Sequence, residues 1–468
     1  MYKPNVIIIV MDSQRVDNLS CYGYSLKTSP NIDRVAEEGV VFLNNFTPCA
    51  WTPPAHASIM TGRYYSGHQL ICLGPMRSVM PSGIPTIAEV LDSLGYDTAS
   101  FSNNHLLTPD EDGILRGFIE CRYPAFEGLR SPRNRIQDIQ RRFFECIEDF
   151  EEGIDKGAAN AIRVIMEWLD RRVAKEIPFF IFVNCTEPHH PYWPPQPFRR
   201  RFLLPGVDDY KARRVPQMSA DGRWIPRYPK SPEEWYILKS LLDGETAALD
   251  HQLGILFNHL RELGVYDDTL IFITSDHGDV LWEHSIKYSS HKSLYDANLH
   301  VPLIVKGPRE HIPAGKRVAN LTQLVDIFPT ILDVLGINDR KIRRSIQGYS
   351  LLLALEKEPV RKYALAEAQN PSIWPSATGP ITVVWSKAIR NQEYKYIWHS
   401  DGREELYNVA EDPTEQNNII NEEKGKAEAL RGELERILLS LDIPEIPINR
   451  HIYNRMIAWG YQRKIIPA

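Results

Sequence analysis

The chain has 468 residues, which at ~150 residues per domain leaves room for two or three folded units. It carries 54 Lys and Arg against 60 Asp and Glu, a formal net charge of −6. This balance excludes a protein that binds nucleic acid through a broad basic surface, but it allows a single anion-binding pocket. With 43% hydrophobic and 24% charged residues, the composition also excludes a mostly disordered chain.

The predicted elements begin with an apolar run at residues 6–11 that is too short to span a bilayer and lacks the flanks of a signal peptide. No other stretch reaches the ~20 apolar residues of a membrane helix, so no membrane partner is expected. Six cysteines, at positions 21, 49, 72, 121, 146 and 185, show no Cys-x-x-Cys spacing. This pattern favours free thiols over disulfides or a zinc knot, and we therefore expect a cytoplasmic protein.

Buried strands and amphipathic helices alternate along most of the chain. In chain order the patterns predict a strand at 6–11, a helix at about 157–174, a strand at 178–184, a helix at 233–264, and strands at 270–274 and 301–305. Such alternation is typical of a mainly parallel α/β sheet. Polar residues follow three of these strands, and ligands bind at the carboxyl ends of strands in such sheets. We therefore expect the chemistry at one edge of the sheet.

The regions 106–141 and 193–232 show no clear periodicity, which fits either substrate-selecting loops or surface packing. After residue 348, short strands at 363–367, 381–385 and 394–398 precede a charged helix at about 422–439. The chain is thus predicted to contain a large α/β domain at 1–350 and a C-terminal α+β subdomain with a tail at 351–468. The aromatic, basic tail 446–468 could pack on its own domain or on a neighbouring subunit, which leaves a homo-oligomer open.

Residues 51–63 form the most informative segment. Thr52 is predicted as the N-cap of a helix, Pro53 fits its first position and Gly62 fits the position just past its end. Taken alone, the segment is most simply a capped helix. A hydroxyl at a helix N-terminus, however, also faces the positive end of the helix dipole, which stabilises a nearby alkoxide or bound oxyanion.

The same segment resembles the signature of the sulfatase family, within the alkaline phosphatase superfamily. That signature reads Cys or Ser, any residue, Pro, any residue, Arg, and then a helix ending in Thr-Gly-Arg. Pro54 matches its proline and residues 61–63 match its end, while Thr52 falls on the nucleophile and His56 on the arginine. Further resemblances follow in family order over roughly residues 4–420, at Asp12, 21–23, 28–31, Asp33, 38–39, 275–278, Lys292, Tyr295, 301–303, 325–330, 405–408, 412–413 and 417–418.

The resemblance implies an alkaline-phosphatase-like α/β sandwich, in which helices flank a large, mainly parallel sheet and a small C-terminal subdomain carries a short antiparallel sheet. Family sulfatases oxidise their Cys or Ser to formylglycine, whose hydrate attacks sulfur. The secondary alcohol of Thr52 would give a ketone, so no formylglycine is expected. Cys49 lacks the proline two residues on and is rejected as a shifted nucleophile. Elsewhere in the superfamily, enzymes that resemble nucleotide pyrophosphatases use a threonine directly.

The resemblance also implies a metal site made by Asp12, Thr52, Asp276 and His277. Mostly oxygen ligands suit Ca²⁺, Mg²⁺ or Mn²⁺, while the histidine admits Mn²⁺ or Zn²⁺. Relatives with two metals clamp the anion between the ions, whereas sulfatase-like relatives use one ion with Lys and His. Because this chain keeps Lys292, we expect one divalent ion. Many sulfatases have paired aspartates where this chain has Asp12 and Ser13, a pattern closer to the phosphonate monoester hydrolase branch.

The remaining site residues are also carried over from the family pattern. Lys292 is expected to contact the non-bridging oxygens of the substrate, and His189 to bind the anion or protonate the leaving group, with His190 as an adjacent competitor. His56 replaces the family arginine, so bidentate clamping of the anion is lost there. Substrate contacts are expected at Asn103, where the family often has lysine, at His105 and at His284. His284 and His291 are the weaker candidates, since loop histidines are often only exposed.

Three functions follow from these patterns. The leading hypothesis is a metal-dependent hydrolase that cleaves a phosphate monoester, phosphodiester or phosphonate ester through a covalent Thr52 intermediate. The second is a sulfuric ester hydrolase that uses unmodified Thr52. The third is an anion-binding pseudoenzyme, although the retained Asp12, Asp276, His277 and Lys292 weigh against it. In each case the partner is a small anionic ester.

Overall fold

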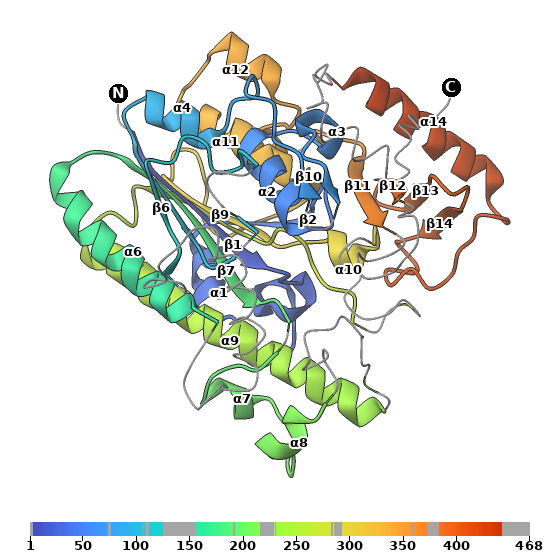
Figure 1. The fold of residues 1–468 in the computed structure, drawn as a ribbon, viewed down its shortest axis with the longest axis horizontal. Coiled ribbons are helices and arrows are strands. Elements are labelled where there is room, and N and C mark those ends of the chain that lie inside the picture. Colours follow the sequence, from blue (N-terminus) through green and yellow to red (C-terminus); the bar gives the residue numbers. More distant parts are fainter. Residues whose placement is uncertain are drawn as a thin grey trace.

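The computed structural model describes residues 3–73, 76–104, 106–107, 112–124, 156–190, 192–215, 229, 231–281, 284, 293–356, 359–371 and 383–441. Its centre is an eight-stranded sheet in the order β10-β2-β9-β8-β1-β7-β5-β6 (Figure 1). The strands are β1 (Asn5–Asp12), β2 (Val40–Phe46), β5 (Asp97–Ser102), β6 (Glu120–Arg122), β7 (Phe179–Pro188), β8 (Thr269–Thr274), β9 (Leu303–Lys306) and β10 (Lys316–Gln323). The four strands predicted from apolar runs are confirmed as β1, β7, β8 and β9.

The sheet is mainly parallel, as the sequence predicts. β1 pairs in parallel with β7 and β8, β7 with β5, β5 with β6, and β2 with β10. β9 is the antiparallel strand of this sheet and lies between β8 and β2. The parallel strands β8, β1, β7 and β5 therefore end side by side, and their carboxyl ends form one continuous edge.

Helices cover both faces of the sheet because the side chains of each central strand alternate between two cores. On β1, Ile7, Ile9 and Met11 belong to the core beneath α1 (Pro30–Glu38), α6 (Ala158–Arg172) and α9 (Pro232–Glu262). Val6, Ile8 and Val10 belong to the opposite core, beneath α2 (Thr52–Thr61), α4 (Ile87–Ser93), α11 (Ile327–Val334) and α13 (Leu351–Ala354). Figure 1 shows α6 and α9 on one side of the sheet and α2, α4 and α11 on the other. The predicted helices at 157–174 and 233–264 correspond to α6 and α9.

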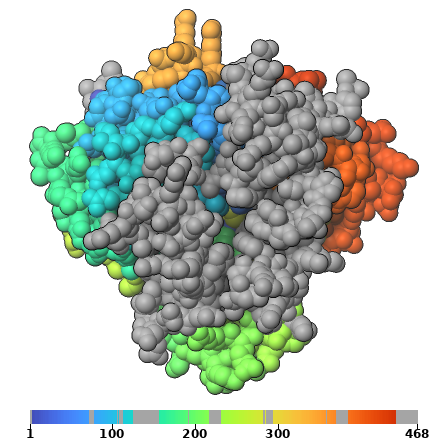
Figure 2. All heavy atoms as spheres, in the orientation of Figure 1, coloured from blue at the N-terminus to red at the C-terminus, as the bar shows by residue number. Residues whose placement is uncertain are grey.

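A second sheet, here called the C-terminal sheet, is an antiparallel meander of β11 (Ala364–Pro371), β12 (Val383–Arg390), β13 (Tyr394–His399) and β14 (Glu404–Asn408). It packs on α14 (Lys424–Ser440) through a core that includes Leu430 and Leu434, and the two lie together at one side of the molecule (Figures 1 and 2). The sequence predicted three of its strands, but β12 ends at Arg390 rather than at residue 385. The sequence did not predict β14. The boundary at residue 350 stays a prediction.

The shorter elements connect these layers. They are α3 (Tyr65–His68), β3 (Cys72–Leu73), β4 (Met76–Arg77), α7 (Phe198–Arg201), α8 (Asp209–Arg213), α10 (Asp296–Leu299), α12 (Arg340–Ser345) and the 3₁₀ turns Val16–Asn18, Ser20–Tyr22, Val173–Lys175 and Leu324–Asp326. The regions predicted to be irregular thus contain β6, α7 and α8 in their described parts. Within the part of the chain that the structure describes, no helix combines the length and apolarity needed to cross a membrane.

Candidate active site

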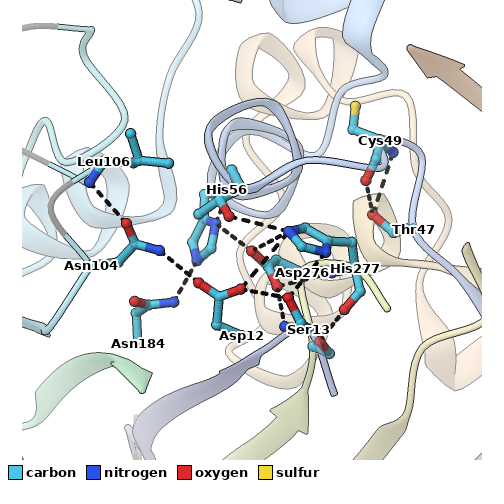
Figure 3. Close-up of polar contacts among 12 residues, drawn as sticks. Asp12, Ser13, Thr47, Cys49, His56, Asn104, Leu106, Asn184, Asp276 and His277 are labelled. Carbon is cyan, nitrogen blue, oxygen red and sulfur yellow. Dashed lines mark hydrogen bonds and ion pairs between the residues drawn. The ribbon is translucent and has the colours of Figure 1, made fainter. Parts of the chain in front are cut away.

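Polar side chains gather at the carboxyl edge of the four neighbouring parallel strands. Asp12 ends β1, Asp276 and His277 follow β8, and Asn104 follows β5, while Asn184 lies on β7. Figure 3 shows these side chains gathered around His56, which lies on α2. The expectation that the polar residues after the strands meet at one edge is therefore confirmed, and the reason is the parallel order β8-β1-β7-β5.

Asp12, Asp276 and His277 form a compact group, here called the Asp–Asp–His cluster. One ligand atom of each lies within 4.8 Å of the others, and all three residues are fully buried. Asp276 Oδ1 accepts hydrogen bonds from the backbone N–H groups of Ser13 (3.3 Å) and His277 (2.9 Å). Asp276 Oδ2 is buried without a hydrogen bond and lies 3.6 Å from His277 Nε2. One carboxylate oxygen is thus left facing the histidine nitrogen.

The hydrogen bonds of His277 determine which of its ring nitrogens faces the cluster. Its Nδ1 lies 2.7 Å from the carbonyl oxygen of Gly278, which can only accept, so Nδ1 carries the proton. The lone pair of the neutral ring is then on Nε2, which lies 3.8 Å from Asp12 Oδ1. This is the arrangement that metal-ligating histidines adopt, with the second nitrogen held by a backbone carbonyl.

The electrostatics of the Asp–Asp–His cluster fit a bound cation. Burial and the neighbouring Asp276 raise the pKa of Asp12 to about 8. Burial lowers the pKa of His277, but the two carboxylates Asp276 and Asp12 outweigh it and leave that pKa raised. Two buried carboxylates beside each other repel, and a divalent ion would offset their charge. Together with Asp276 Oδ2, which makes no hydrogen bond, the donor set fits one divalent ion.

Thr52 faces the Asp–Asp–His cluster from the helical layer. It is the first residue of α2, and its Oγ1 lies 3.2 Å from His277 Nε2. The predicted N-cap role of Thr52 is therefore wrong, because its hydroxyl contacts His277 and Trp51 occupies the cap position instead. The predicted end of the helix is confirmed, since Gly62 follows it with φ +64°, a conformation that favours glycine.

His56 lies one helical turn after Thr52 and is fully buried. Its Nδ1 lies 2.8 Å from the carbonyl oxygen of Thr52 and must carry the ring proton, so its Nε2 accepts from Asn184 Nδ2 at 3.2 Å. Burial lowers the pKa of His56, although Asp276 acts in the opposite direction. The contacts describe a neutral ring that holds the backbone of Thr52 against β7.

Three polar residues at this edge were not predicted as site residues from the sequence. Asn104 Nδ2 donates to Asp12 Oδ2 at 2.6 Å, and Ser13 Oγ donates to Asp12 Oδ1 at 3.0 Å, while Asn184 holds His56. The family comparison assigned Asn103, one residue earlier, whose backbone N–H donates to the carbonyl of Asn184 at 3.2 Å. Only the backbone path after β5 decides which of the two adjacent asparagines reaches Asp12.

This arrangement predicts different effects for the two asparagines. Replacing Asn104 by alanine removes the donor that orients Asp12, and we expect the Kd for Mn²⁺ to rise by about 10-fold or more. Asn103→Ala is the matched control and should leave the Kd unchanged. Titration of metal-stripped protein with Mn²⁺ measures both values. Equal Mn²⁺ affinities for the two variants would contradict the assignment of Asn104 to Asp12.

The two adjacent histidines differ in their surroundings. His189 Nδ1 lies 2.6 Å from the carbonyl oxygen of His190, so it carries the proton and leaves the lone pair on Nε2. Burial, the neighbouring His190 and the more distant His277 lower the pKa of His189 well below its ordinary value. His190 is buried with its Nδ1 3.4 Å from Asp279 Oδ2, which also accepts from the hydroxyl of Tyr192. His190 therefore contacts a buried acidic residue next to the site, whereas the lowered pKa of His189 favours its neutral form.

The other predicted contacts are not brought together in the same way. His284 stacks on Tyr295, with ring centroids 3.6 Å apart. Lys292 and His105, as well as His291, lie outside the described residues. Among the described residues, the structure thus brings together Asp12, Thr52, Asp276, His277 and His56, and it places Asn103 at the same edge.

Comparison with known proteins agrees with this geometry. The profile of the family described as Sulfatase matches residues 4–337, and one described as N-sulphoglucosamine sulphohydrolase, C-terminal, matches residues 283–442. The chain is 26% identical to N-acetylglucosamine-6-O-sulfatase of Bacteroides thetaiotaomicron, with 93% of this chain and 85% of that protein covered. It is 25% identical to arylsulfatase K of Homo sapiens, with 97% and 86% covered.

Among solved structures, phosphonate monoester hydrolase of Agrobacterium radiobacter superposes with a TM-score of 0.72 and 26% identity, over 94% of this chain and 95% of that one. The predicted fold, with its large mainly parallel sheet, flanking helices and small antiparallel sheet, is confirmed by this likeness. The family profile covers well over half of the chain, and the chain therefore belongs to the sulfatase family of hydrolases, within the alkaline phosphatase superfamily.

Proposed function

We propose that this hydrolase cleaves a phosphonate ester, phosphate monoester or phosphodiester through a covalent bond to Thr52. The observation that carries the proposal is the position of Thr52 Oγ1, 3.2 Å from His277 Nε2 at the edge of the Asp–Asp–His cluster. The likeness to the phosphonate monoester hydrolase of Agrobacterium radiobacter supports an ester of phosphorus. A threonine cannot become an aldehyde, which is a chemical reason to expect a direct attack by its oxygen.

The first step forms a bond between Thr52 Oγ1 and phosphorus, while the bond from phosphorus to the oxygen of the leaving group breaks. Thr52 gives its hydroxyl proton to water and the leaving oxygen takes up one proton from water, so the net change is the transfer of one proton from Thr52 to the leaving group. A divalent ion held by Asp12, Asp276, His277 and Thr52 would lower the pKa of the hydroxyl and offset the charge of the ester oxygens. The N-terminus of the ten-residue helix α2 contributes a positive potential at the same place.

The second step is hydrolysis of the Thr52–phosphorus bond by water. His189 suits this step, because its Nδ1–H is held by the carbonyl of His190 and its Nε2 can accept a proton from water. His56 has no free acceptor for Thr52, because Nδ1 donates to the carbonyl of Thr52 and Nε2 accepts from Asn184. We therefore assign His56 the role of holding the backbone at Thr52. Lys292 remains the proposed cation for the non-bridging oxygens.

A sulfuric ester hydrolase that uses unmodified Thr52 is the second candidate, favoured because the curated relatives are named as sulfatases. Matched 4-nitrophenyl sulfate, 4-nitrophenyl phosphate and 4-nitrophenyl phenylphosphonate, assayed with Mn²⁺, Ca²⁺, Zn²⁺ or Mg²⁺, separate the two candidates. A higher kcat/KM on the phosphorus esters supports the leading proposal, and a higher value on the sulfate overturns it in favour of the second. Lack of turnover on every ester with every metal would contradict both and leave the anion-binding pseudoenzyme.

The raised pKa of Asp12 predicts how the effect of metal depends on pH. The pKa of Asp12 in the folded protein, about 8, exceeds the ordinary value of 3.8. Without metal, the free energy of unfolding therefore falls as the pH rises between these two values, because the folded state binds the proton more tightly than the unfolded state. Metal binding requires the charged carboxylate, and the raised pKa of His277 acts in the same direction. The increase in melting temperature on adding Mn²⁺ should therefore be larger at about pH 8 than at about pH 5. Thermal denaturation of wild type and Asp12→Asn tests this. A wild-type increase that is the same at both pH values would contradict it.

A further inference from the structure

The C-terminal sheet is joined to helix α10 by a buried ion-pair network. Asp296, the first residue of α10, accepts from Lys395 Nζ on Oδ1 at 2.8 Å and from Arg390 on Oδ2 at 2.9 Å. Lys395 lies on β13 and is fully buried, and Arg390 ends β12. Helix α10, which lies between β8 and β9 in the chain, is thus held by two cations of the C-terminal sheet.

Glu415 closes this network from the loop after β14. Its Oε1 lies 2.6 Å from Lys395 Nζ, and its Oε2 accepts from the backbone N–H of Asp296 at 2.6 Å. Lys395 therefore lies between two carboxylates, and its removal would leave both without their shared cation in a buried position. Asp296 is fixed through both its side chain and its backbone.

Tyr295, next to Asp296, makes a second attachment to the C-terminal sheet. Its hydroxyl donates to Glu405 Oε2 on β14 at 2.9 Å, and its ring stacks on His284 at 3.6 Å between centroids. Glu405 also accepts from His399 and from Tyr407, which fixes its carboxylate. The position of His284, a candidate substrate contact, thus depends on a tyrosine held by β14.

The other end of α10 contacts the turn that carries His277. The backbone N–H of Gly278 donates to the carbonyl of Asn298 at 2.8 Å, and a Cβ on Gly278 would clash with the carbonyl oxygen of Ala297. The carbonyl of Gly278 in turn accepts from His277 Nδ1 at 2.7 Å, the contact that directs Nε2 toward Asp12 and Asp276. A shift of α10 would therefore move Gly278 and turn the ring of His277.

We propose that the C-terminal sheet positions the Asp–Asp–His cluster, with Lys395 as the positioning residue that acts through Asp296, α10 and Gly278. The path runs from Lys395 to Asp296 by an ion pair, along α10 to Asn298, and by hydrogen bonds from Asn298 to Gly278 and from Gly278 to His277. The proposal rests on the proposed function only in taking the cluster as a metal site. It assigns the C-terminal sheet a part in metal binding, although the residues of that sheet do not belong to the cluster.

The test compares Lys395→Met with Leu434→Ala in the full chain. Leu434 is a buried residue of α14, and its truncation weakens the same C-terminal unit without touching α10. Hydrogen–deuterium exchange reports on the amides of Gly278, Leu299 and His300, which donate to Asn298, Tyr295 and Asp296. Mn²⁺ titration of the metal-stripped proteins reports on the cluster. We expect Lys395→Met to speed exchange at these amides and to raise the Kd for Mn²⁺ by about 10-fold or more, relative to Leu434→Ala.

Equal exchange and equal Mn²⁺ affinity in the two variants would overturn the proposal. Faster exchange without a change in Mn²⁺ affinity would also overturn it, because α10 would then be anchored without consequence for the cluster. If Lys395→Met fails to fold, Tyr295→Phe removes the hydroxyl that bonds to Glu405 and Tyr407, keeps the ring beside His284 and is judged by the same two measurements. A wild type that binds Mn²⁺ but hydrolyses none of the esters would contradict the proposed function alone, since neither measurement needs turnover.

Discussion

Replacing Thr52 by alanine is expected to lower kcat for the best ester substrate by about 10⁴-fold or more, as removal of a covalent nucleophile does in other enzymes. The reason is geometric, because Thr52 Oγ1 is the hydroxyl that faces His277 Nε2 from the N-terminus of α2. Thr52→Ser keeps a hydroxyl on the same carbon and should retain measurable hydrolysis. Steady-state kinetics of the purified variants at saturating Mn²⁺ provide the measurement.

The matched control for this variant is Thr61→Ala. Thr61 is a buried threonine at the other end of the same helix, and its hydroxyl donates to the carbonyl of Ala57 at 2.6 Å. Its removal changes the stability of α2 without touching the Asp–Asp–His cluster, so kcat should stay close to that of wild type. Hydrolysis by Thr52→Ala at the rate of Thr61→Ala would contradict a covalent mechanism. Mass spectrometry of Thr52 after rapid quenching offers a direct check on the phosphorylated or phosphonylated residue.

Replacing Asp276 by asparagine is expected to raise the Kd for Mn²⁺ by more than about 100-fold and to remove activity with it. Removing a residue that only orients a metal ligand already lowers metal affinity by about 10–100-fold, and removing the ligand itself should lower it further. Asp276 Oδ2 is buried and makes no hydrogen bond, so the substitution removes the oxygen that is left for a cation. Calorimetric titration with Mn²⁺ and assays over a range of metal concentrations measure the two effects.

Asp250→Asn is the control for charge removal from a buried carboxylate. Asp250 lies on α9, and its oxygens accept from the backbone N–H groups of Asn31 and Ile32 at the start of α1. This variant should lose stability but keep wild-type affinity for Mn²⁺. If the two variants bind Mn²⁺ equally well, the Asp–Asp–His cluster is not the metal site.

The fold could be predicted because its signals are local. Continuous apolar runs such as that of β1 mark strands buried on both faces, and long amphipathic stretches such as α9 mark their covering helices. The short strand β14 was missed, because five residues with two glutamates at the start do not read as a strand. The hydrophobic pattern also could not predict that β9 pairs antiparallel to β8 and β2, since strand direction depends on how the chain returns to the sheet.

The candidate site likewise has one part that the sequence predicted and one part that it did not. The resemblance to the sulfatase family pointed to Asp12, Thr52, His56, Asp276 and His277, which the structure brings together at one edge. Two of the supporting groups, Asn104 and Asn184, could not be predicted, because each depends on a distance between segments far apart in the sequence. Ser13 adjoins Asp12, but only the turn after β1 brings its hydroxyl to the carboxylate. Asn104 and Asp12 are separated by 92 positions in the sequence, and Asn184 and His56 by 128. The protonated nitrogen of His277 is likewise decided by a backbone carbonyl that only the folded turn places beside it.

The sequence by itself determined the kind of sheet, the edge at which the chemistry lies and a threonine that cannot become formylglycine. These follow from side-chain chemistry and from periodicity within single elements. Only the tertiary structure decided which nitrogen of His277 is available, which asparagine supports Asp12 and how Lys395 of the C-terminal sheet reaches Asp296. Each of these is a contact of about 3 Å, the first within the turn after β8 and the other two between separate elements. The latter two exist only after the sheet, the helices and the C-terminal sheet have packed together.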